Sequence, residues 1–410
     1  MNSLLRTHAE TIVRNAIRAV QPDDAVRRAL EDQAFPGRVI LVAAGKAAWQ
    51  MAKAAHTCLG SRISSGIVIT KYDHVPEPLD GILCLEAGHP VPDENSFRAT
   101  GQALRMTANL TPEDTVLFLL SGGGSALFEQ PLVSGEILQD ITGQLLACGA
   151  DIIEINTIRK RLSAVKGGRF ALHCAPARVF SIVLSDILGD PLDMIASGPA
   201  APDTSTCEQA LAIAKKYRLR LSDAALSLLH RETPKHLNNV STRITGSVRE
   251  LCAAGAESCR ALGYEPVLLT DMLCCEAREA GSFLASVART HAGNGKKLAF
   301  LAGGETVVHL TGTGKGGRNQ ELALSAAQGI SGVPGVCVFS VGSDGTDGPT
   351  DAAGGYADGD TAPELKQLGI SIHSVLCGND AYQALKAVDG LIFTGPTGTN
   401  VNDLAVVLVE

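Results

Sequence analysis

The stretch DTVLFLLSGGGSALFEQP, residues 114–131, contains a strand, a sharp turn and the start of a helix in one short segment. Its apolar run TVLFLL is short enough for a single buried strand, and the residues after the glycines are compatible with a helix. A strand that is apolar on both faces is typical of a parallel sheet covered by helices on both sides. The stretch therefore predicts a strand–turn–helix unit of an α/β protein.

Similar apolar runs lie on both sides of this unit in the first half of the chain: RVILVAAG (38–45), GIVIT (66–70) and ARVFSIVLSDI (177–187). Because they alternate with helix-compatible segments, the pattern predicts βαβ units and a parallel sheet. Parallel sheets bind their ligands at the carboxyl ends of the strands. The segments AAGKAA, LSGGGSAL and LSDILGDPLDMIASGP follow three of these strands, so we expect the functional residues there.

The chain length of 410 residues predicts two domains, since single cores rarely grow beyond about 250–300 residues. The polar segment LHRETPKHLNNVSTRITGS (229–247) lacks periodicity, so we place the boundary within it and expect domains at 1–237 and 238–410. The second domain reads as another α/β unit. In it, KKLAFLAGGETVVHL (296–310) suggests two strands that meet at a Gly-Gly turn.

Composition narrows the class of protein. A hydrophobic content of 45% indicates a globular chain, and a formal net charge of −8 argues against nucleic acid as the main partner. The eleven Cys lack zinc-site spacing and are expected to be free thiols. We find no signal peptide and no apolar run of the about 18 residues that a membrane span needs, so we expect a cytoplasmic protein. The N-terminal segment predicts an amphipathic helix with Leu5, Ile12, Val13, Ala16, Ile17 and Val20 on one side.

Two explanations are possible for the run of three glycines. Glycines permit positive φ and close backbone approach, and flanking serines add hydroxyl donors, so the loop can present several N–H groups to a phosphate or carboxylate. A sharp turn for packing a helix on the sheet is the alternative, and it needs fewer glycines. The anion-cradle interpretation is favoured, and its candidate residues are Ser121, Gly122, Gly123, Gly124 and Ser125.

Basic residues gather in two places within this acidic protein. Lys46 stands where a strand ends and a helix begins, a position that gains nothing from the helix dipole and so hints at a bound anion. The segment INTIRKRLSAVKGGRFA (155–171) concentrates five cations, among them Arg159 and Lys166. The alternative interpretations are a surface lysine at a helix start and a solvated basic face.

Aspartates cluster in two turn-rich segments. Asp186 follows the strand within SDILGDPLDMIASGPAAPDTST (185–206), and Asp344 and Asp347 lie in GSDGTDGPTDAAGG (342–355). Such aspartates commonly cap helices or form Asx turns. They are also candidates to hold Mg²⁺, which prefers a few carboxylates plus solvent. Asp403 stands in another glycine loop, TGPTGTNVNDLAVVL (394–408).

The segment GGETVVHLTGTGKGGRNQELAL (303–324) contains a dinucleotide-type pattern, since Gly312, Gly314 and Gly317 satisfy GxGxxG. Two features count against NAD. The loop carries Lys315 and Arg318, which suit a terminal polyphosphate or a carboxylate better than an internal pyrophosphate, and no acidic strand end follows at the usual spacing. We interpret it as a basic loop with Arg318 at the start of a helix.

Taken together, the motifs resemble those of the glycerate 2-kinases of the MOFRL type, a family once often labelled hydroxypyruvate reductases. The matching segments span nearly the whole chain in family order: AAGKAA, LSGGGSAL, INTIRKRLSAVKGG, SDILGDPLDMIASGP, GGET, GKGGRNQE, GSDGTDGPTDAAGG and GPTGTNVND. The resemblance implies a Rossmann-like N-terminal domain, a smaller C-terminal MOFRL α/β domain and an active site in the cleft between them. It also implies transfer of the γ-phosphoryl group of ATP, with Mg²⁺, to the 2-hydroxyl of D-glycerate.

The resemblance carries over two facing cations, Lys46 and Arg318. Beside them we assign Asp186 a catalytic role. Arg159, Lys166, Lys315, Asn319 and the 121–125 loop are expected to bind glycerate or nucleotide, and Asp344 and Asp347 are expected to hold the metal. The segment SDILGDPLD departs from the family's more usual SDVPGDDPS, which weakens a metal role for its later aspartates. The expected partners are small molecules, and a homodimer stays open.

Two other functions remain as alternatives. An NAD(P)H-dependent hydroxypyruvate reductase is supported by the GxGxxG pattern and by the old family label. A non-catalytic nucleotide-binding regulator fits the fold but leaves the dispersed cations and carboxylates unexplained. An assay of phosphoryl transfer and of NADH oxidation distinguishes the three.

Overall fold

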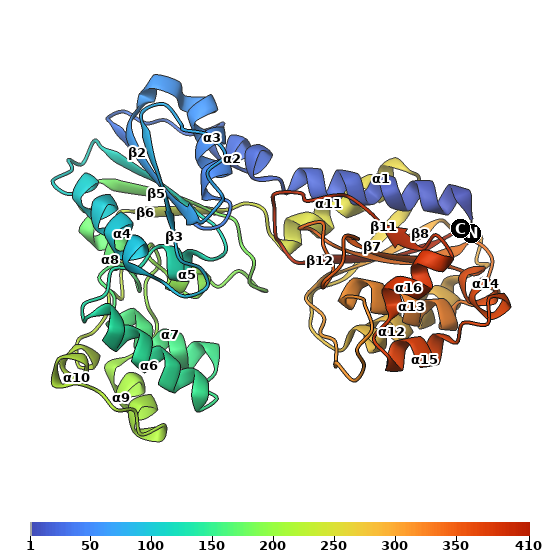
Figure 1. The fold of residues 1–410 in the computed structure, drawn as a ribbon. Helices are drawn as coiled ribbons and strands as arrows, with labels where there is room; N and C mark the ends of the chain where they lie inside the picture. The colour runs from blue at the N-terminus through green and yellow to red at the C-terminus, as the bar shows by residue number, and fades with distance from the viewer. Residues whose placement is uncertain (1) are drawn as a thin grey trace. The chain divides into compact units, whose positions relative to one another are not determined.

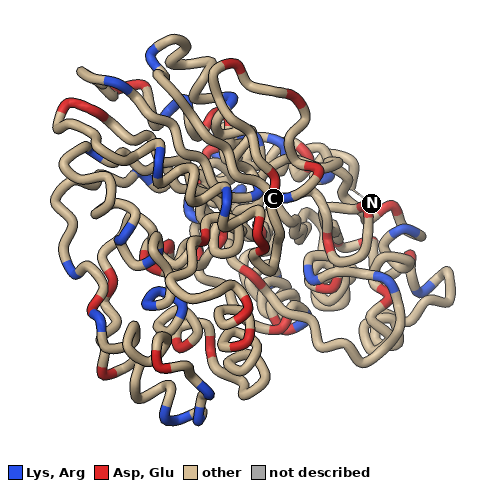
Figure 2. The backbone as a smooth tube through the Cα atoms, turned by 60° about the vertical axis from the view of Figure 1, so that its left-hand side comes forward, with Lys and Arg blue, Asp and Glu red and all other residues tan. Residues whose placement is uncertain are grey.

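The computed structural model describes residues 2–410, which form two compact units (Figure 1). We call Pro22–Thr245 the central unit, and residues 2–21 together with Gly246–Glu410 the terminal unit. No described helix is long and apolar enough to cross a membrane. Figure 2 shows Lys and Arg interspersed with Asp and Glu along the backbone.

The central unit is built on a parallel sheet of six strands in the order β3-β2-β1-β4-β5-β6. Each neighbouring pair is parallel, as the alternation of apolar runs and helices predicted. The strands are β1 (Val39–Ala44), β2 (Ile63–Lys71), β3 (Ile82–Ala87), β4 (Thr115–Leu120), β5 (Arg178–Val183) and β6 (Val240–Ile244). The helices are α2 (Pro22–Leu30), α3 (Ala48–Leu59), α4 (Glu94–Met106), α5 (Gly124–Leu127), α6 (Gly135–Ala147), α7 (Ile152–Arg161), α8 (Arg169–His173), α9 (Cys207–Lys216) and α10 (Asp223–Leu229), with 3-10 turns at Gly60–Arg62 and Ile195–Ser197.

Helices cover both faces of this sheet, which explains why β1 and β4 are buried at every position. Val42 and Phe118 point to a core shared with α4 and α8, whereas Leu41 and Leu117 point to a core shared with α2 and α3. The helices α6, α7, α9 and α10 form a further cluster with a core of their own (Figure 1). The middle strands β1 and β4 therefore lie in the buried interior, and their carboxyl ends carry the loops that follow.

The terminal unit contains a mixed sheet in the order β11-β10-β9-β12-β8-β7. β7 and β8 pair in parallel, while β12 is antiparallel to both β8 and β9. Its strands are β7 (Glu265–Leu273), β8 (Leu298–Gly304), β9 (Val336–Gly342), β10 (Gly354–Asp358), β11 (Leu391–Ile392) and β12 (Asp403–Val409). Its helices are α1 (Ser3–Ala19), α11 (Val248–Ala261), α12 (Ala277–His291), α13 (Arg318–Gly329), α14 (Thr361–Gln367), α15 (Ile372–Cys377) and α16 (Ala381–Ala387).

The N-terminal helix α1 has the amphipathic pattern that the sequence predicted, and its apolar side is buried. It belongs to the terminal unit, where the Asn15 side-chain amide donates to the Ser258 hydroxyl of α11 at 3.0 Å and His8 lies 2.8 Å from the Tyr264 hydroxyl. The predicted division placed this helix in the first domain. An amphipathic pattern predicts that one side of a helix is buried, but it does not predict which surface covers that side. In the structure, α1 packs in the terminal unit.

The boundary between the units also differs from the predicted one. Residues 240–244 form β6, which pairs with β5 at the edge of the central sheet, and the central unit ends at Thr245 rather than at 237. β6 is only partly buried along its length and carries polar residues, so it lacks the apolar run that marked the other strands. Edge strands of this kind resemble a linker in sequence.

The GGETVVHL segment does not form a second strand. β8 continues through Gly303 and Gly304, which pair with Leu404 and Asp403 of β12. The chain then leaves the sheet, and only an isolated bridge joins Val307 to Glu276. A Cβ on Gly304 would lie 2.1 Å from the Leu273 carbonyl oxygen, so this glycine serves close strand packing and not a turn.

Candidate functional site

Three predicted segments meet at the carboxyl edge of the central sheet. At their last residues β1 and β4 pair through Ala44 and Leu120, and Leu120 pairs with Val183 of β5. Lys46 follows β1, the glycine loop (residues 121–125) follows β4, and Asp186 follows β5. Neighbouring parallel strands end at the same edge, which places these segments side by side.

Hydrogen bonds join the turn after β1 to the glycine loop. The amide of Lys46 donates to the Gly122 carbonyl at 2.9 Å, and the amide of Ala47 donates to Oγ of Ser121 at 3.1 Å. Ser121 is only 3% exposed. Its hydroxyl oxygen anchors the neighbouring turn, and its contact with a ligand stays a prediction.

Close packing accounts for all three loop glycines. A Cβ on Gly122 would lie 2.1 Å from Oδ2 of Asp186, and a Cβ on Gly124 would lie 2.7 Å from Cβ of Ala196. Gly123 has φ of 86°, a conformation that L side chains rarely adopt. Within residues 2–410 the amides of Gly122 and Gly123 donate to no acceptor, so the same loop also presents two unpaired N–H groups.

Lys46 is the exposed cation beside this loop. Its aliphatic stem packs on the loop, since a Cβ on Gly123 would lie 3.1 Å from Cγ of Lys46. Its ammonium makes no hydrogen bond or ion pair with any described residue, in contrast to the buried cations of the same unit. A cation without a carboxylate partner leaves its charge available to a ligand.

Arg159 and Lys166 lie behind the glycine loop. The Lys166 ammonium donates to the carbonyls of Ser125 at 2.9 Å and of Phe128 at 3.3 Å, and the Arg159 guanidinium donates to the Ser125 carbonyl at 2.9 Å. The Ser125 hydroxyl faces that of Ser197 at 3.0 Å. Lys166 is fully buried, and burial lowers its pKa to about 8. Both cations therefore hold the loop backbone instead of facing solvent.

Glu129 compensates these two charges, and no motif in the sequence indicated it. The residue is fully buried, and its Oε2 lies 3.4 Å from Nζ of Lys166 and 3.8 Å from Nη2 of Arg159. Neither oxygen has a hydrogen-bond partner within the described chain. In sequence, a glutamate shortly after a glycine loop resembles a surface residue. Only its burial beside two cations reveals its role.

We expect Glu129→Gln to lower the free energy of unfolding by about 3–5 kcal/mol, the cost of leaving buried charge without its partner. The measurement is urea-induced unfolding followed by fluorescence of Trp49, the chain's single tryptophan, which lies on α3 of the central unit. Glu77→Gln is the matched control, because Glu77 pairs with Lys53 at 2.8 Å on the exposed surface. Its loss should cost no more than about 1 kcal/mol. Equal stability of the two variants would contradict a buried ionic role for Glu129.

In the terminal unit, two carboxylates hold Arg318 at the start of α13. Its Nε and Nη2 donate to Asp403 at 2.6 and 3.0 Å, and its Nη1 donates to Glu305 at 3.0 Å. Burial alone would lower the pKa of Arg318, but the hydrogen bonds and charges of Asp403 and Glu305 raise it. A bidentate pair fixes the plane of the guanidinium, so the position of this cation is set before any ligand binds.

Asp347 occupies the N-terminus of α13. Its carboxylate accepts hydrogen bonds from the amides of Asn319 at 3.1 Å and Gln320 at 2.8 Å, and from the Asn319 side-chain amide at 3.2 Å. Burial raises the pKa of Asp347 to about 7, although these hydrogen bonds act in the opposite direction. Asp347 therefore caps the helix, and Asn319, predicted to bind nucleotide, is buried beside it.

The two predicted metal ligands do not fit a preformed magnesium site. Both oxygens of Asp347 are engaged by the first turn of α13. Asp344 accepts hydrogen bonds from the amide and hydroxyl of Thr346 at 2.9 and 3.1 Å, in a local turn. Over residues 2–410, no group of three or more His, Cys, Asp or Glu side chains is placed to hold a metal ion.

The GxGxxG glycines serve loop packing. Cβ atoms on Gly312 and Gly314 would lie 2.2 and 2.5 Å from the Gly378 carbonyl oxygen, and one on Gly317 would lie 2.3 Å from the Asp347 carboxylate. Lys315 is tied to the same region, since its ammonium lies 4.4 Å from the ring centroid of Tyr382. A dinucleotide pyrophosphate would need the first amides of α13, and Asp347 already binds them.

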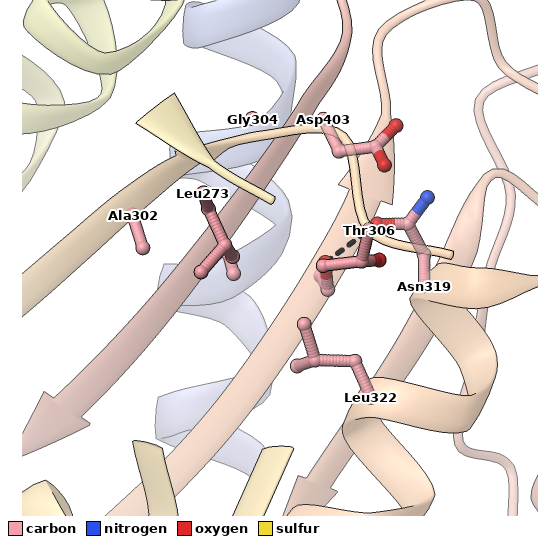
Figure 3. A pocket seen from close by; sticks show the side chains of 9 residues that line it. Leu273, Ala302, Gly304, Thr306, Asn319, Leu322 and Asp403 are labelled. Carbon is pink, nitrogen blue, oxygen red and sulfur yellow. Dashed lines mark hydrogen bonds between the residues drawn. The ribbon is translucent and has the colours of Figure 1, made fainter. Parts of the chain in front are cut away.

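A small cavity lies beneath this network, between α13 and the sheet (Figure 3). Its volume of about 10 Å³ suits a single water molecule. Asn319 and Ser340 line it and are joined by a 2.5 Å hydrogen bond, and Asp403 lies at its upper end. The Thr306 hydroxyl is buried on its wall without a partner among the described residues. The packing around Asp403 therefore rests on polar groups as well as on apolar side chains.

Comparison with known proteins places the chain in a family. Residues 8–230 match the family described as a domain of unknown function, DUF4147, and residues 298–403 match the MOFRL family. A D-glycerate 2-kinase of Thermotoga maritima is 52% identical over 99% of this chain and 98% of its own length. A protein of Agrobacterium vitis, provisionally named a hydroxypyruvate reductase, is 39% identical over 91% of this chain and all of its own.

A crystal structure of glycerate kinase from Thermotoga maritima covers 100% of both chains, with 51% sequence identity and a TM-score of 0.96. The parallel sheet, the smaller α/β unit and the ordered motifs agree with the resemblance seen in sequence. The chain belongs to the MOFRL-type glycerate 2-kinase family.

Proposed function

We propose that this protein is an ATP-dependent D-glycerate 2-kinase. It transfers the γ-phosphoryl group of ATP to the 2-hydroxyl of D-glycerate and releases ADP and 2-phosphoglycerate. The observation that carries the proposal is the unpaired ammonium of Lys46 beside the unpaired amides of Gly122 and Gly123. Phosphoryl transfer asks a protein mainly to position the reactants and to offset charge on the phosphoryl oxygens, and these groups supply positive charge at a fixed place.

In the central unit, we assign the substrate-facing roles to Lys46, the glycine amides and Asp186. The amides and Lys46 bind an anionic group, and the Asp186 carboxylate, which packs against Gly122, orients the acceptor hydroxyl. Arg159, Lys166, Ser121 and Ser125 keep the loop in shape from behind. Because their polar groups contact the loop itself, we assign these four residues to holding the loop backbone and not to direct contact with glycerate.

In the terminal unit, we assign the nucleotide to Arg318, with Lys315 and Asn319 as its supports. Arg318 retains exposed surface, and its guanidinium is oriented by Asp403 and Glu305. Lys315 is exposed on the adjoining loop, and Asn319 holds the first turn of α13 together with Asp347. A preorganised guanidinium can stabilise charge that develops on a transferred phosphoryl group.

A kinase uses ATP as its phosphoryl donor, and this substrate follows from the proposed activity. Magnesium is proposed as a companion of the nucleotide, because Mg²⁺ usually keeps several waters and binds through substrate phosphates with one or two carboxylates. The residues of this chain do not form an ion cage of their own, as described above for Asp344 and Asp347. None of the assigned roles depends on a protein-held ion.

The test is an assay of purified protein with ATP, Mg²⁺ and D-glycerate. We expect ADP release in a coupled assay and formation of 2-phosphoglycerate, identified by ³¹P NMR, with no 3-phosphoglycerate. In a parallel reaction with NADH and hydroxypyruvate, we expect no oxidation of NADH. NADH oxidation without ADP release would overturn the proposal in favour of the reductase, and tight ATP binding without turnover on any hydroxy acid would favour a regulator.

A further inference from the structure

His89 lies at the same sheet edge as Lys46, although no motif in the sequence pointed to it. It stands in the loop between β3 and α4, two residues after the end of β3. A Cβ on Gly123 would lie 3.0 Å from Cδ2 and 3.1 Å from Nε2 of His89, and 3.1 Å from Cγ of Lys46. The imidazole edge and the lysine stem therefore pack against the same side of the glycine loop.

Three loops thus bring different side chains to two adjacent glycines. Asp186, after β5, packs against Gly122, while Lys46, after β1, and His89, after β3, pack against Gly123. The two glycine amides next to them are unpaired within residues 2–410. A bound anion with a neighbouring hydroxyl would meet a cation, free amides and an imidazole at one place.

The surroundings of His89 favour its neutral form. The ring is partly buried and makes no hydrogen bond or ion pair with any described residue. Desolvation and the positive charges of Lys46 and Lys71 lower its pKa below the ordinary value of 6.5. The acid of its own loop, Asp93, is engaged by Ser96 and Tyr72, and Asp186 is the carboxylate that reaches the glycine loop from β5. At neutral pH one ring nitrogen therefore keeps a free lone pair.

We propose that His89 is a catalytic residue, the general base that takes the proton from the acceptor hydroxyl. This inference rests on the kinase function proposed above. As the hydroxyl oxygen forms its bond to the γ-phosphorus, its proton passes to the imidazole nitrogen. The bond from the γ-phosphorus to the bridging oxygen breaks, ADP leaves with that electron pair, and His89 later releases the proton to solvent. The Lys46 ammonium has no lone pair with which to accept this proton. Lys46 therefore binds the anionic group, and His89 accepts the proton.

The experiment compares the pH dependence of wild-type enzyme with that of His89→Gln. We expect kcat to fall about 100-fold, at the lower end of the range for loss of general-base catalysis, with the KM for ATP within about threefold of wild type. The wild-type kcat/KM for glycerate should fall as pH drops below 6.5, because protonation removes the base. In His89→Gln this acid limb should vanish. Added imidazole should restore part of the activity of His89→Ala.

His74→Gln is the matched control, since His74 lies on the exposed loop before β3. Its hydrogen bonds within residues 2–410 reach only the Tyr72 carbonyl and Glu86. It should behave as wild type. If wild-type protein phosphorylates glycerate while His89→Gln keeps kcat within about threefold, or loses rate with its acid limb intact and no imidazole rescue, the role of His89 is wrong and the kinase function stands. Wild-type protein without any phosphoryl transfer would overturn both proposals.

Discussion

Arg318→Ala is expected to lower kcat for D-glycerate phosphorylation by at least ~100-fold, the scale for removing one preorganised charge stabiliser. The guanidinium is held by Asp403 through two hydrogen bonds and by Glu305 through a third, so its charge is in place before ATP arrives. The measurement is steady-state ADP release with both substrates saturating. Because the role lies in the transition state, kcat should fall more than the affinity for glycerate.

Two further variants separate charge from orientation. Arg318→Lys keeps the positive charge but loses the planar guanidinium that makes two hydrogen bonds to Asp403. We expect this variant to recover only a small part of the wild-type rate. Arg260→Ala is the matched control, since Arg260 lies on α11 of the same unit and pairs with Glu257 at 2.9 Å on the surface. It should retain wild-type activity. Near-normal turnover by Arg318→Ala would exclude the proposed role.

Lys46→Met is expected to lower kcat by at least ~100-fold while leaving the fold unchanged. Methionine keeps an apolar stem that can pack on Gly123, so the substitution removes the ammonium and little else. The ammonium has no protein partner within residues 2–410, so its loss should leave no buried charge uncompensated. We therefore expect an unfolding midpoint close to that of wild type and a large loss in rate.

The control for this variant is Lys53→Met. Lys53 lies on the same helix, α3, and pairs with Glu77 on the surface at 2.8 Å. Activity should survive this change, because an exposed ion pair contributes little and the residue lies outside the glycine loop. A Lys46→Met enzyme as active as Lys53→Met would remove the observation on which the proposed function rests.

The central sheet could be read from sequence because its signal is local. A strand buried on both faces is typically an apolar run, and such runs occur in β1, in β4 and, interrupted only by Ser181, in β5 after Arg178. The positions of Lys46, the glycine loop and Asp186 follow from the same rule, since each comes directly after such a strand. β6 was not predicted, because an edge strand can be partly exposed and polar. The central unit therefore ends at Thr245 and not near residue 237, where we predicted the boundary.

The roles of the charged residues could not be predicted from the local sequence. Arg159 and Lys166 occur in a basic helix and the turn after it, a segment that resembles a solvated face in sequence. Their partner Glu129 lies about 30 to 40 residues earlier and is fully buried. Asp347 resembles a turn or a metal ligand until its carboxylate is seen on the first amides of α13. Whether a charge is buried depends on partners that no local pattern specifies.

The sequence alone predicted the α/β class, a parallel sheet of apolar strands and the glycine loop with Lys46 beside it, because spacing and local polarity carry this information. The family followed from the resemblance of its motifs. Only the tertiary structure assigned α1 to the terminal unit, brought His89 to Gly123 and placed Glu129 between two cations. Those contacts join distant segments. Their energy comes from desolvation and charge pairing in the folded interior, which a linear pattern cannot express.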